Sequence, residues 1–222
     1  MKNPTILWWG RFDKNYSRNR IMRQSLKSLN YQLMDFIPLF SQWGFAEATL
    51  RNIKKTDFVW VPCFRQRDIA SAHKWCLKHN IKLIIDPLIS SWDKRVNEKT
   101  NTLSKKSIHK IKQRESALFN KADVVISDTV KHSELFIDDL LVNKNKIYTV
   151  FVGAEENIFT PQKINHNDSN SFEVLFYGSF ITLQGTTVII DAAKKMGANG
   201  IVKWTLLGNG PELQLCKKLA GA

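Results

Sequence analysis

Apolar runs alternate with stretches of helical spacing along most of the chain. Residues 4–9 form an apolar run that ends at Gly10, which is typical of a strand buried on both faces. A polar loop follows, and from Ser17 apolar residues recur at helical spacing, at Ile21, Met22, Leu26 and Leu29. We expect a helix to begin at Ser17, whose hydroxyl can cap it.

The same unit of strand and helix then repeats. The pattern predicts strands at 58–61, 81–85, 124–126 and 146–152, and helices near 67–79, 104–121 and 130–142. Apolar strands that alternate with amphipathic helices form parallel sheets with helices on both faces. We therefore expect an α/β fold with a Rossmann-like, doubly wound parallel sheet.

A second, shorter unit follows a polar stretch. We place the first domain at 1–157, a linker at 158–171 and a second domain at 172–222. The second domain contains predicted strands at 173–177 and 202–207, a helix at 186–196 and a helix that Pro211 opens. Two strands and two helices cannot cover both faces of a parallel sheet, so we expect a partial Rossmann-like domain with an open sheet edge and exposed apolar surface.

Composition places the chain among globular proteins. Hydrophobic residues make up 43% and charged residues 24% of its 222 residues. No apolar run approaches the roughly 20 residues of a membrane span, and none near the start resembles a signal peptide. The three cysteines are odd in number and scattered, which favours reduced thiols. These features predict a cytoplasmic protein.

The net charge of +13 lies entirely in the first part of the chain. Residues 1–154 contain 27 Lys and Arg against 14 Asp and Glu, whereas residues 155–222 contain six of each. Such an excess attracts nucleic acid, an anionic membrane or a phosphorylated substrate, and charge alone does not choose among them. The basic residues of the predicted helix at 104–121 fit either a solvated face or contact with an anionic surface: Lys105, Lys106, Lys110, Lys112 and Arg114.

Glycines directly follow three of the apolar runs. Gly10, Gly178 and the pair Gly208 and Gly210 stand where a parallel sheet binds ligands, beyond the carboxyl ends of its strands. These glycines either let the backbone approach a phosphate or only permit tight turns. Leu213 occupies the third glycine position of a dinucleotide fingerprint, and there is no P-loop motif, so we expect neither a nicotinamide site nor a P-loop hydrolase.

Two further groups of residues are candidates for a catalytic or metal-binding role. Asp86 ends the predicted strand at 81–85 and can act as a base, accept a hydrogen bond from a hydroxyl, or cap the following loop. His73, Cys76 and His79 are spaced by three on a predicted helix. Steps of three rotate around a helix, so these side chains do not face one ion and we expect no metal site.

The order and spacing of several segments resemble a known family. The chain contains GRFDKNYSRNRI, IDPLISSWD, KADVVISDTVKH, VFVGAEENIFTP, VLFYGSFITLQG and TLLGNGPEL. In this order they resemble family 4-type glycosyltransferases of the two-Rossmann B fold, and the resemblance covers essentially the whole chain. It implies a first domain that binds the acceptor, a second that binds a nucleotide-diphosphate sugar as donor, and transfer with retained anomeric configuration and no required cofactor or metal.

The resemblance also assigns residues to binding sites. It places Gly10, Arg11 and Asp86 at the acceptor, and it places donor-binding residues at Gly178, Ser179, Gln184, Gly185, Gly208 and Gly210. The family usually has a basic residue where this chain has Gln184. The family also has two glutamates eight positions apart in its donor domain, and no glutamate here has a second one eight positions on. The resemblance therefore implies a truncated donor domain, with catalytic residues that are unknown apart from Asp86 as a possibility.

These observations predict a glycosyltransferase scaffold for synthesis of a cell-envelope polysaccharide or glycolipid, inactive in these 222 residues alone. The basic first domain fits a lipid-linked or glycan acceptor and a peripheral position on the inner face of the membrane, and we expect no nucleic-acid partner. The alternative is a non-catalytic Rossmann-like module that binds an anionic partner or a membrane surface.

Overall fold

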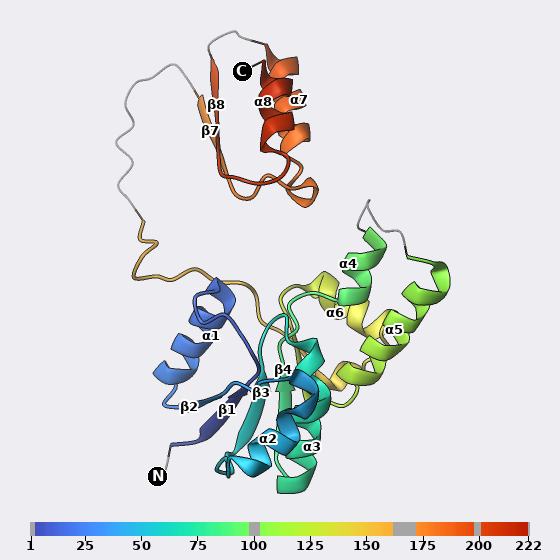
Figure 1. Ribbon diagram of the computed structural model, residues 1–222. Helices are drawn as coiled ribbons and strands as arrows, with labels where there is room; N and C mark the ends of the chain where they lie inside the picture. The colour runs from blue at the N-terminus through green and yellow to red at the C-terminus, as the bar shows by residue number, and fades with distance from the viewer. Residues whose placement is uncertain (1–2, 98–102, 162–171, 198–200, 222) are drawn as a thin grey trace. The chain divides into compact units, whose positions relative to one another are not determined.

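The computed structural model describes residues 3–97, 103–161, 172–197 and 201–221 (Figure 1). The chain divides into two compact units, Met1–Thr160 and Pro161–Ala222, and each is described by itself. Most of the linker predicted at 158–171 lies outside the described residues. No helix in the described ranges is both long and apolar enough to cross a lipid bilayer.

The first unit is built on a six-stranded, wholly parallel sheet. Its strands are β1 (Thr5–Trp9), β2 (Gln32–Phe36), β3 (Phe58–Val61), β4 (Lys82–Ile85), β5 (Val124–Ser127) and β6 (Ile147–Thr149), in the order β2-β1-β3-β4-β5-β6. Strand β1 pairs with β2 on one side and β3 on the other, so the direction of the crossovers reverses between β1 and β3. This reversal is the topological switch point, where sheets of this kind bind ligands.

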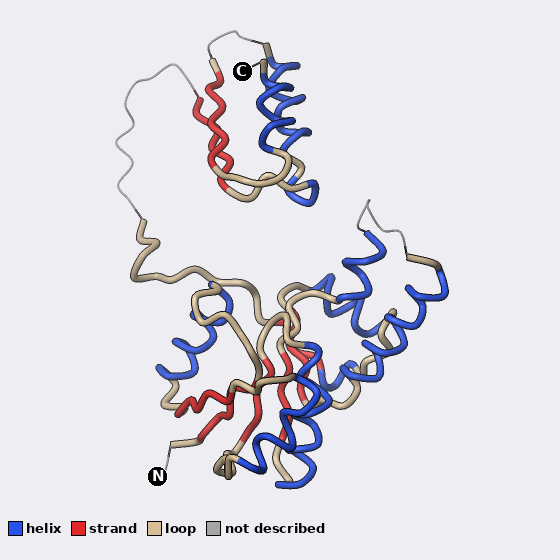
Figure 2. Tube along the Cα trace, in the orientation of Figure 1, coloured by secondary structure: helices blue, strands red, loops and turns tan. Residues whose placement is uncertain are grey.

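Helices cover both faces of this sheet (Figure 2). They are α1 (Ser17–Ser28), α2 (Gly44–Leu50), α3 (Ile69–His79), α4 (Ser91–Asn97), α5 (Lys105–Phe119) and α6 (Val130–Asp138), with 3-10 turns η1 (Ser41–Trp43), η2 (Gln66–Asp68) and η3 (Lys144–Lys146). Successive strand residues point to opposite faces, so Trp9 packs in the core shared with α2, α3, α5 and α6, whereas Trp8 packs toward α1. The doubly wound α/β fold expected from the sequence is confirmed.

Several boundaries differ from those that the sequence predicts. Strand β2 and helices α2 and α4 were not predicted. The helix α1 starts at Ser17 as expected, but Tyr16 occupies the N-cap position and no side chain caps the helix. Helix α6 ends at Asp138, before the predicted end at 142, and Leu141 adopts a left-handed backbone conformation (φ 55°) that a helix cannot contain.

The second unit has two parallel strands, β7 (Phe172–Tyr177) and β8 (Val202–Leu207). A short turn η4 (Thr182–Gln184) precedes α7 (Thr186–Met196), and α8 (Leu213–Ala220) begins two residues after Pro211. Both helices pack on one face of the strands, around Phe180, Ile190 and Cys216. On these strands the exposed apolar side chains include Leu175, Tyr177 and Leu207 (61%, 75% and 64% exposed), as expected for a partial domain.

Candidate functional site

The turn after β1 brings the first predicted glycine against a buried ion pair. Gly10 donates its N–H to the Phe36 carbonyl (3.0 Å) and has φ 134°, a conformation that favours glycine. A Cβ atom at this position would lie 3.2 Å from Oδ2 of Asp68 and 3.4 Å from the Arg65 side chain. Gly10 therefore allows the pair of Arg65 and Asp68 to sit close to the switch point of the sheet.

Asp68 fixes the orientation of the Arg65 guanidinium. Asp68 is fully buried, and its Oδ2 lies 2.7 Å from Nε and 2.6 Å from Nη2 of Arg65. Nη2 also donates to the Ser41 hydroxyl (3.0 Å). Burial raises the pKa of the Asp68 carboxyl, and Arg65 acts in the opposite direction. The Asp68 carboxylate and the Ser41 hydroxyl thus fix the orientation of Arg65 in the absence of a ligand.

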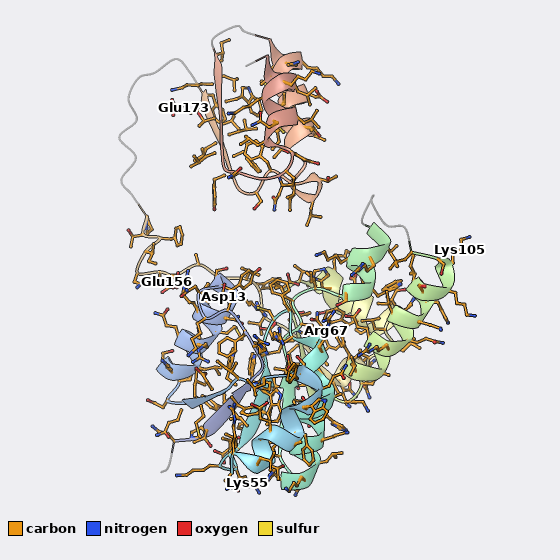
Figure 3. All side chains as sticks on the ribbon, in the orientation of Figure 1. Asp13, Lys55, Arg67, Lys105, Glu156 and Glu173 are labelled. Atoms are coloured by element: carbon orange, nitrogen blue, oxygen red, sulfur yellow. The ribbon has the colours of Figure 1, made fainter. Side chains whose placement is uncertain are left out.

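A cavity of about 450 Å³ opens beside this pair. We call it the arginine pocket, because Arg11, Arg65, Arg67 and Arg114 line it. Its apolar lining consists of Leu39, Phe40 and Trp43, which follow β2. Arg11 donates from Nη1 to the Leu39 carbonyl (3.1 Å). Arg67 lies at the opposite end of the first unit from Lys55 (Figure 3).

The predicted acceptor residues therefore divide between two places. Arg11 lines the arginine pocket and Gly10 lies against the Arg65 side chain of that pocket, whereas Asp86 follows β4 and does not line it. The sequence did not predict Arg65, Arg67 or Arg114 as pocket residues, because they come from η2 and α5 and share no motif with Arg11. Only the sheet order brings these segments together.

Asp86 forms a buried ion pair with Arg18, from the first turn of α1. The exposed fractions of these residues are 1% and 2%. Arg18 donates from Nε to Oδ2 (3.0 Å) and from Nη2 to Oδ1 (3.1 Å) of Asp86, and from Nη1 to the Val150 carbonyl (2.7 Å). Burial raises the pKa of Asp86, and Arg18 lowers it. Both carboxylate oxygens are occupied, so Asp86 can act as a base only if this ion pair opens.

A pair of Asp128 and His132, which the sequence analysis missed, lies at the carboxyl end of β5. The Thr129 hydroxyl caps α6 by accepting from the His132 backbone N–H (3.1 Å). Oδ1 of Asp128 contacts Nδ1 of His132, which fixes the ring and directs the hydrogen-bonding role of Nε2. The half-buried His132 can therefore exchange a proton at Nε2. The available signal was an Asp and a His four residues apart, directly after a buried strand.

His73, Cys76 and His79, for which we expected no metal site, all lie on α3. Cys76 is buried in the main core, and the His79 ring contacts the Trp75 ring in a tilted arrangement, with ring centroids 4.1 Å apart. Within the described ranges no group of three or more His, Cys, Asp and Glu side chains is arranged to hold a metal ion.

In the second unit, glycines let the two strand-end loops interlock. A Cβ atom on Gly208 would lie 1.8 Å from the Gly178 carbonyl oxygen, and one on Gly210 would lie 2.5 Å from the Phe180 carbonyl oxygen. The Phe180 N–H donates to the Asn209 carbonyl (2.9 Å) across the two loops. The loops after β7 and β8, which contain most of the predicted donor residues, thus lie side by side.

The other predicted donor residues lead into α7. Gly185 occupies the N-cap position with φ 65°, and Gln184 before it is exposed. The Glu212 carboxylate accepts hydrogen bonds from the Thr182 hydroxyl (2.5 Å) and the Thr186 hydroxyl (3.3 Å). The Glu212 carboxylate therefore lies beside the position predicted for the donor diphosphate. The sequence did not predict a negative charge at this position.

The basic face of α5 is smaller than the sequence predicts. Lys112 forms an ion pair with Asp139 (2.7 Å) and lies 4.2 Å from the centre of the Trp92 ring. Its charge is therefore compensated within the first unit. Lys105, Lys106, Lys110 and Arg114 are exposed. Arg114 lines the arginine pocket, so the three lysines are the residues of this group that are available to an anionic surface away from the pocket.

Comparison with solved structures finds proteins that share the fold along nearly the whole chain. HepE from Anabaena, in a crystal structure with UDP, has a TM-score of 0.65 and 14% identity, over 98% of this chain and 66% of HepE. HepE is also similar in its complex with UDP-glucose. The apo form of the lipopolysaccharide outer core galactosyltransferase WaaB has a TM-score of 0.63 and 11% identity, over 98% of this chain and 64% of WaaB.

A glycosyltransferase from Rickettsia africae has a TM-score of 0.58 and 12% identity, over 100% of this chain and 65% of that protein. The chain thus spans slightly less than two thirds of the length of each of these proteins. No protein-family model and no curated protein sequence matches it. The likenesses show that the chain has a glycosyltransferase fold of the B type.

Proposed function

We propose that the protein takes part in transfer of a sugar from a nucleotide-diphosphate sugar, with acceptor binding in the first unit and donor binding in the second. The observation that carries this proposal is the shared fold along 98% of the chain with HepE, which was crystallised with UDP and with UDP-glucose. The loops at the carboxyl ends of the strands support it, because sheets of this type bind ligands there.

The family 4 resemblance makes the proposal more specific. Transfer would retain the anomeric configuration and would not need a metal ion. The paired glutamates of the family are not among these 222 residues, so we propose that the chain by itself binds ligands and does not complete transfer. The pair of Asp128 and His132 is our candidate for contact with the reacting hydroxyl, because Nε2 of His132 can accept a proton.

We further propose that the protein serves cell-envelope polysaccharide or glycolipid synthesis, at the inner face of the membrane. The excess of 13 positive charges in residues 1–154 supports this position, since anionic lipid attracts basic surfaces. The alternative, a non-catalytic module that binds an anionic partner, is supported by the arginine pocket, which does not depend on the second unit for any of its lining residues.

Donor binding can be tested at Gln184. If the loop before α7 meets the diphosphate, Gln184→Arg adds a charged donor to it and should raise the affinity for UDP by about tenfold. The control is Leu183→Arg, which adds the same charge at a neighbouring side chain that is 88% exposed. Affinity is measured by calorimetric titration of UDP at physiological salt, where general charge attraction is screened.

A selective effect of Gln184→Arg supports the proposed donor loop. If the chain and both variants fail to bind UDP or UDP-glucose, the donor role of the second unit is wrong and the binding-module alternative is favoured. Sugar transfer to a membrane extract by the purified chain would contradict the proposal that these residues do not complete the reaction.

A further inference from the structure

The arginine pocket carries positive charge that its surroundings do not balance. Asp68 pairs with Arg65, but in the part of the chain that the structure describes, the Arg67 and Arg114 side chains have no hydrogen-bond or ion-pair partner. Arg11 donates to a carbonyl group. Guanidinium groups around one cavity repel one another, and an anionic ligand would relieve this repulsion.

The geometry of the pocket suits a phosphate or diphosphate. A guanidinium presents its donors in a planar fork that matches two oxygens of a phosphate. Arg65 is already oriented by Asp68 and Ser41, so it loses little side-chain freedom when it binds. A volume of about 450 Å³ is larger than one phosphate group needs and is in the usual range of small-molecule sites.

The remaining wall of the pocket is apolar and exposed. Leu39, Phe40 and Trp43 are 62%, 69% and 70% exposed, although aromatic side chains are usually buried or engaged in binding. They follow β2 and reach the cavity from the side of η1. An anionic subsite and an apolar subsite therefore lie next to each other in one cavity.

We infer that the arginine pocket binds an acceptor in which a phosphate or diphosphate group is joined to an apolar chain. The four arginines hold the oxyanion, and Phe40 and Trp43 cover the first part of the chain. This inference rests on the proposed function, because it assigns a chemical class to the acceptor that the first unit binds. The apolar chain distinguishes a lipid-linked acceptor from a soluble phosphate compound.

Three probes separate the two parts of the ligand: farnesyl diphosphate, inorganic diphosphate and the uncharged amphiphile octyl glucoside. Titrated into the full chain, farnesyl diphosphate should bind more tightly than either of the others. The double variant Arg67→Gln and Arg114→Gln should lower the affinity for both diphosphates by at least about tenfold, since it removes charge-assisted hydrogen bonds. Phe40→Ala combined with Trp43→Ala should weaken binding of farnesyl diphosphate and leave binding of inorganic diphosphate unchanged.

The matched control is Lys105→Gln with Lys106→Gln, which removes the same charge at exposed positions that do not line the pocket. Equal weakening by the control and by the arginine variant would overturn the inference in favour of general charge attraction. Equal affinity for farnesyl diphosphate and inorganic diphosphate would overturn the inference that the acceptor has an apolar chain. The ligand of the pocket would then be a soluble phosphate compound. Circular dichroism of each variant confirms that the exposed substitutions leave the fold intact.

Titration of UDP separates this inference from the proposed function. UDP binding that responds to Gln184→Arg and not to the arginine variant supports separate donor and acceptor sites. If farnesyl diphosphate fails to bind while UDP still responds at Gln184, the acceptor class is wrong and the proposed function stands. If UDP binding is lost in the arginine variant, the pocket is a nucleotide site and the inference is wrong.

Discussion

At the scale of single residues, the buried pair of Arg18 and Asp86 determines how the loops around the candidate site are held. Arg18 joins the first turn of α1 to the end of β4 and to the carbonyl groups of Val150 and Phe151 after β6. Three segments that are far apart in the sequence thus depend on one guanidinium. A buried ion pair of this kind is expensive to break, because the partner that remains keeps a buried charge.

We predict that Arg18→Met destabilises the first unit by about 3–5 kcal/mol at neutral pH. Without Arg18 the pKa of Asp86, already raised by burial, rises further. A carboxyl whose folded-state pKa is raised contributes stability below its unfolded pKa and loses it as the pH rises through the folded value. The destabilisation should therefore be smaller near pH 4 than at neutral pH.

Urea unfolding at the two pH values measures this difference. Adding Asp86→Leu to Arg18→Met removes the unpaired carboxylate and should restore part of the lost stability at neutral pH. A cost that is equal at both pH values would show that Asp86 does not keep a buried charge in the single variant.

At the scale of elements, contacts from other elements fix the ends of helices and loops. Glu115 of α5 accepts hydrogen bonds from the backbone N–H groups of Ser91 and Trp92 (2.8 and 2.9 Å) and from the Ser90 hydroxyl (2.6 Å). This carboxylate stabilises the start of α4 in the way that an N-cap residue does. The Ser90 hydroxyl in turn accepts from the Asp93 backbone N–H (3.0 Å), so the start of α4 combines a local cap with a contact from α5.

The interlocked loops of the second unit lead to a prediction about glycine. Gly208→Ala would place a Cβ atom 1.8 Å from the carbonyl oxygen and 2.9 Å from the carbonyl carbon of Gly178. Both atoms belong to the backbone, so the two loops must separate. We expect a loss of more than about 3 kcal/mol in the stability of the second unit. The control, Gly221→Ala, also has a positive φ (81°, compared with 156° at Gly208) but open space around it, and should cost about 1 kcal/mol.

Amide hydrogen exchange of β7 and β8 reports the stability of the second unit separately from the first. Exchange that accelerates equally in both glycine variants would mean that the backbone conformation, and not the close approach of the loops, requires Gly208.

At the scale of the whole molecule, the charge distribution leads to a prediction about membranes. Replacing Lys105, Lys106 and Lys110 with Gln should weaken binding to vesicles that contain anionic lipid by up to about a hundredfold, since each lysine near the surface contributes about 1 kcal/mol. Lys112 is left unchanged, because it pairs with Asp139. Binding should also weaken as added salt screens the charges.

Vesicle sedimentation at low and physiological salt measures this effect. The control variant replaces Lys54, Lys55 and Lys74 with Gln, which are also exposed, and Lys55 lies at the far end of the first unit from Lys105 (Figure 3). If both triple variants bind the vesicles equally, the exposed lysines of α5 form only a solvated helix face.

The sequence by itself determined the alternation of buried strands and amphipathic helices, because apolar periodicity is a local property. Residues 4–9, 186–196 and 202–207 illustrate this, since the elements found there lie within one residue of those predicted. It did not determine β2, because Gln32 and Asp35 interrupt the apolar run and the strand depends on its pairing with β1. Gly10 and Arg11 were also recognisable, because they directly follow a buried strand. Only the tertiary structure decided that Arg65, Arg67 and Arg114 join Arg11 around one pocket, since the order of the strands, and not the order of the sequence, brings η2 and α5 to the end of β1.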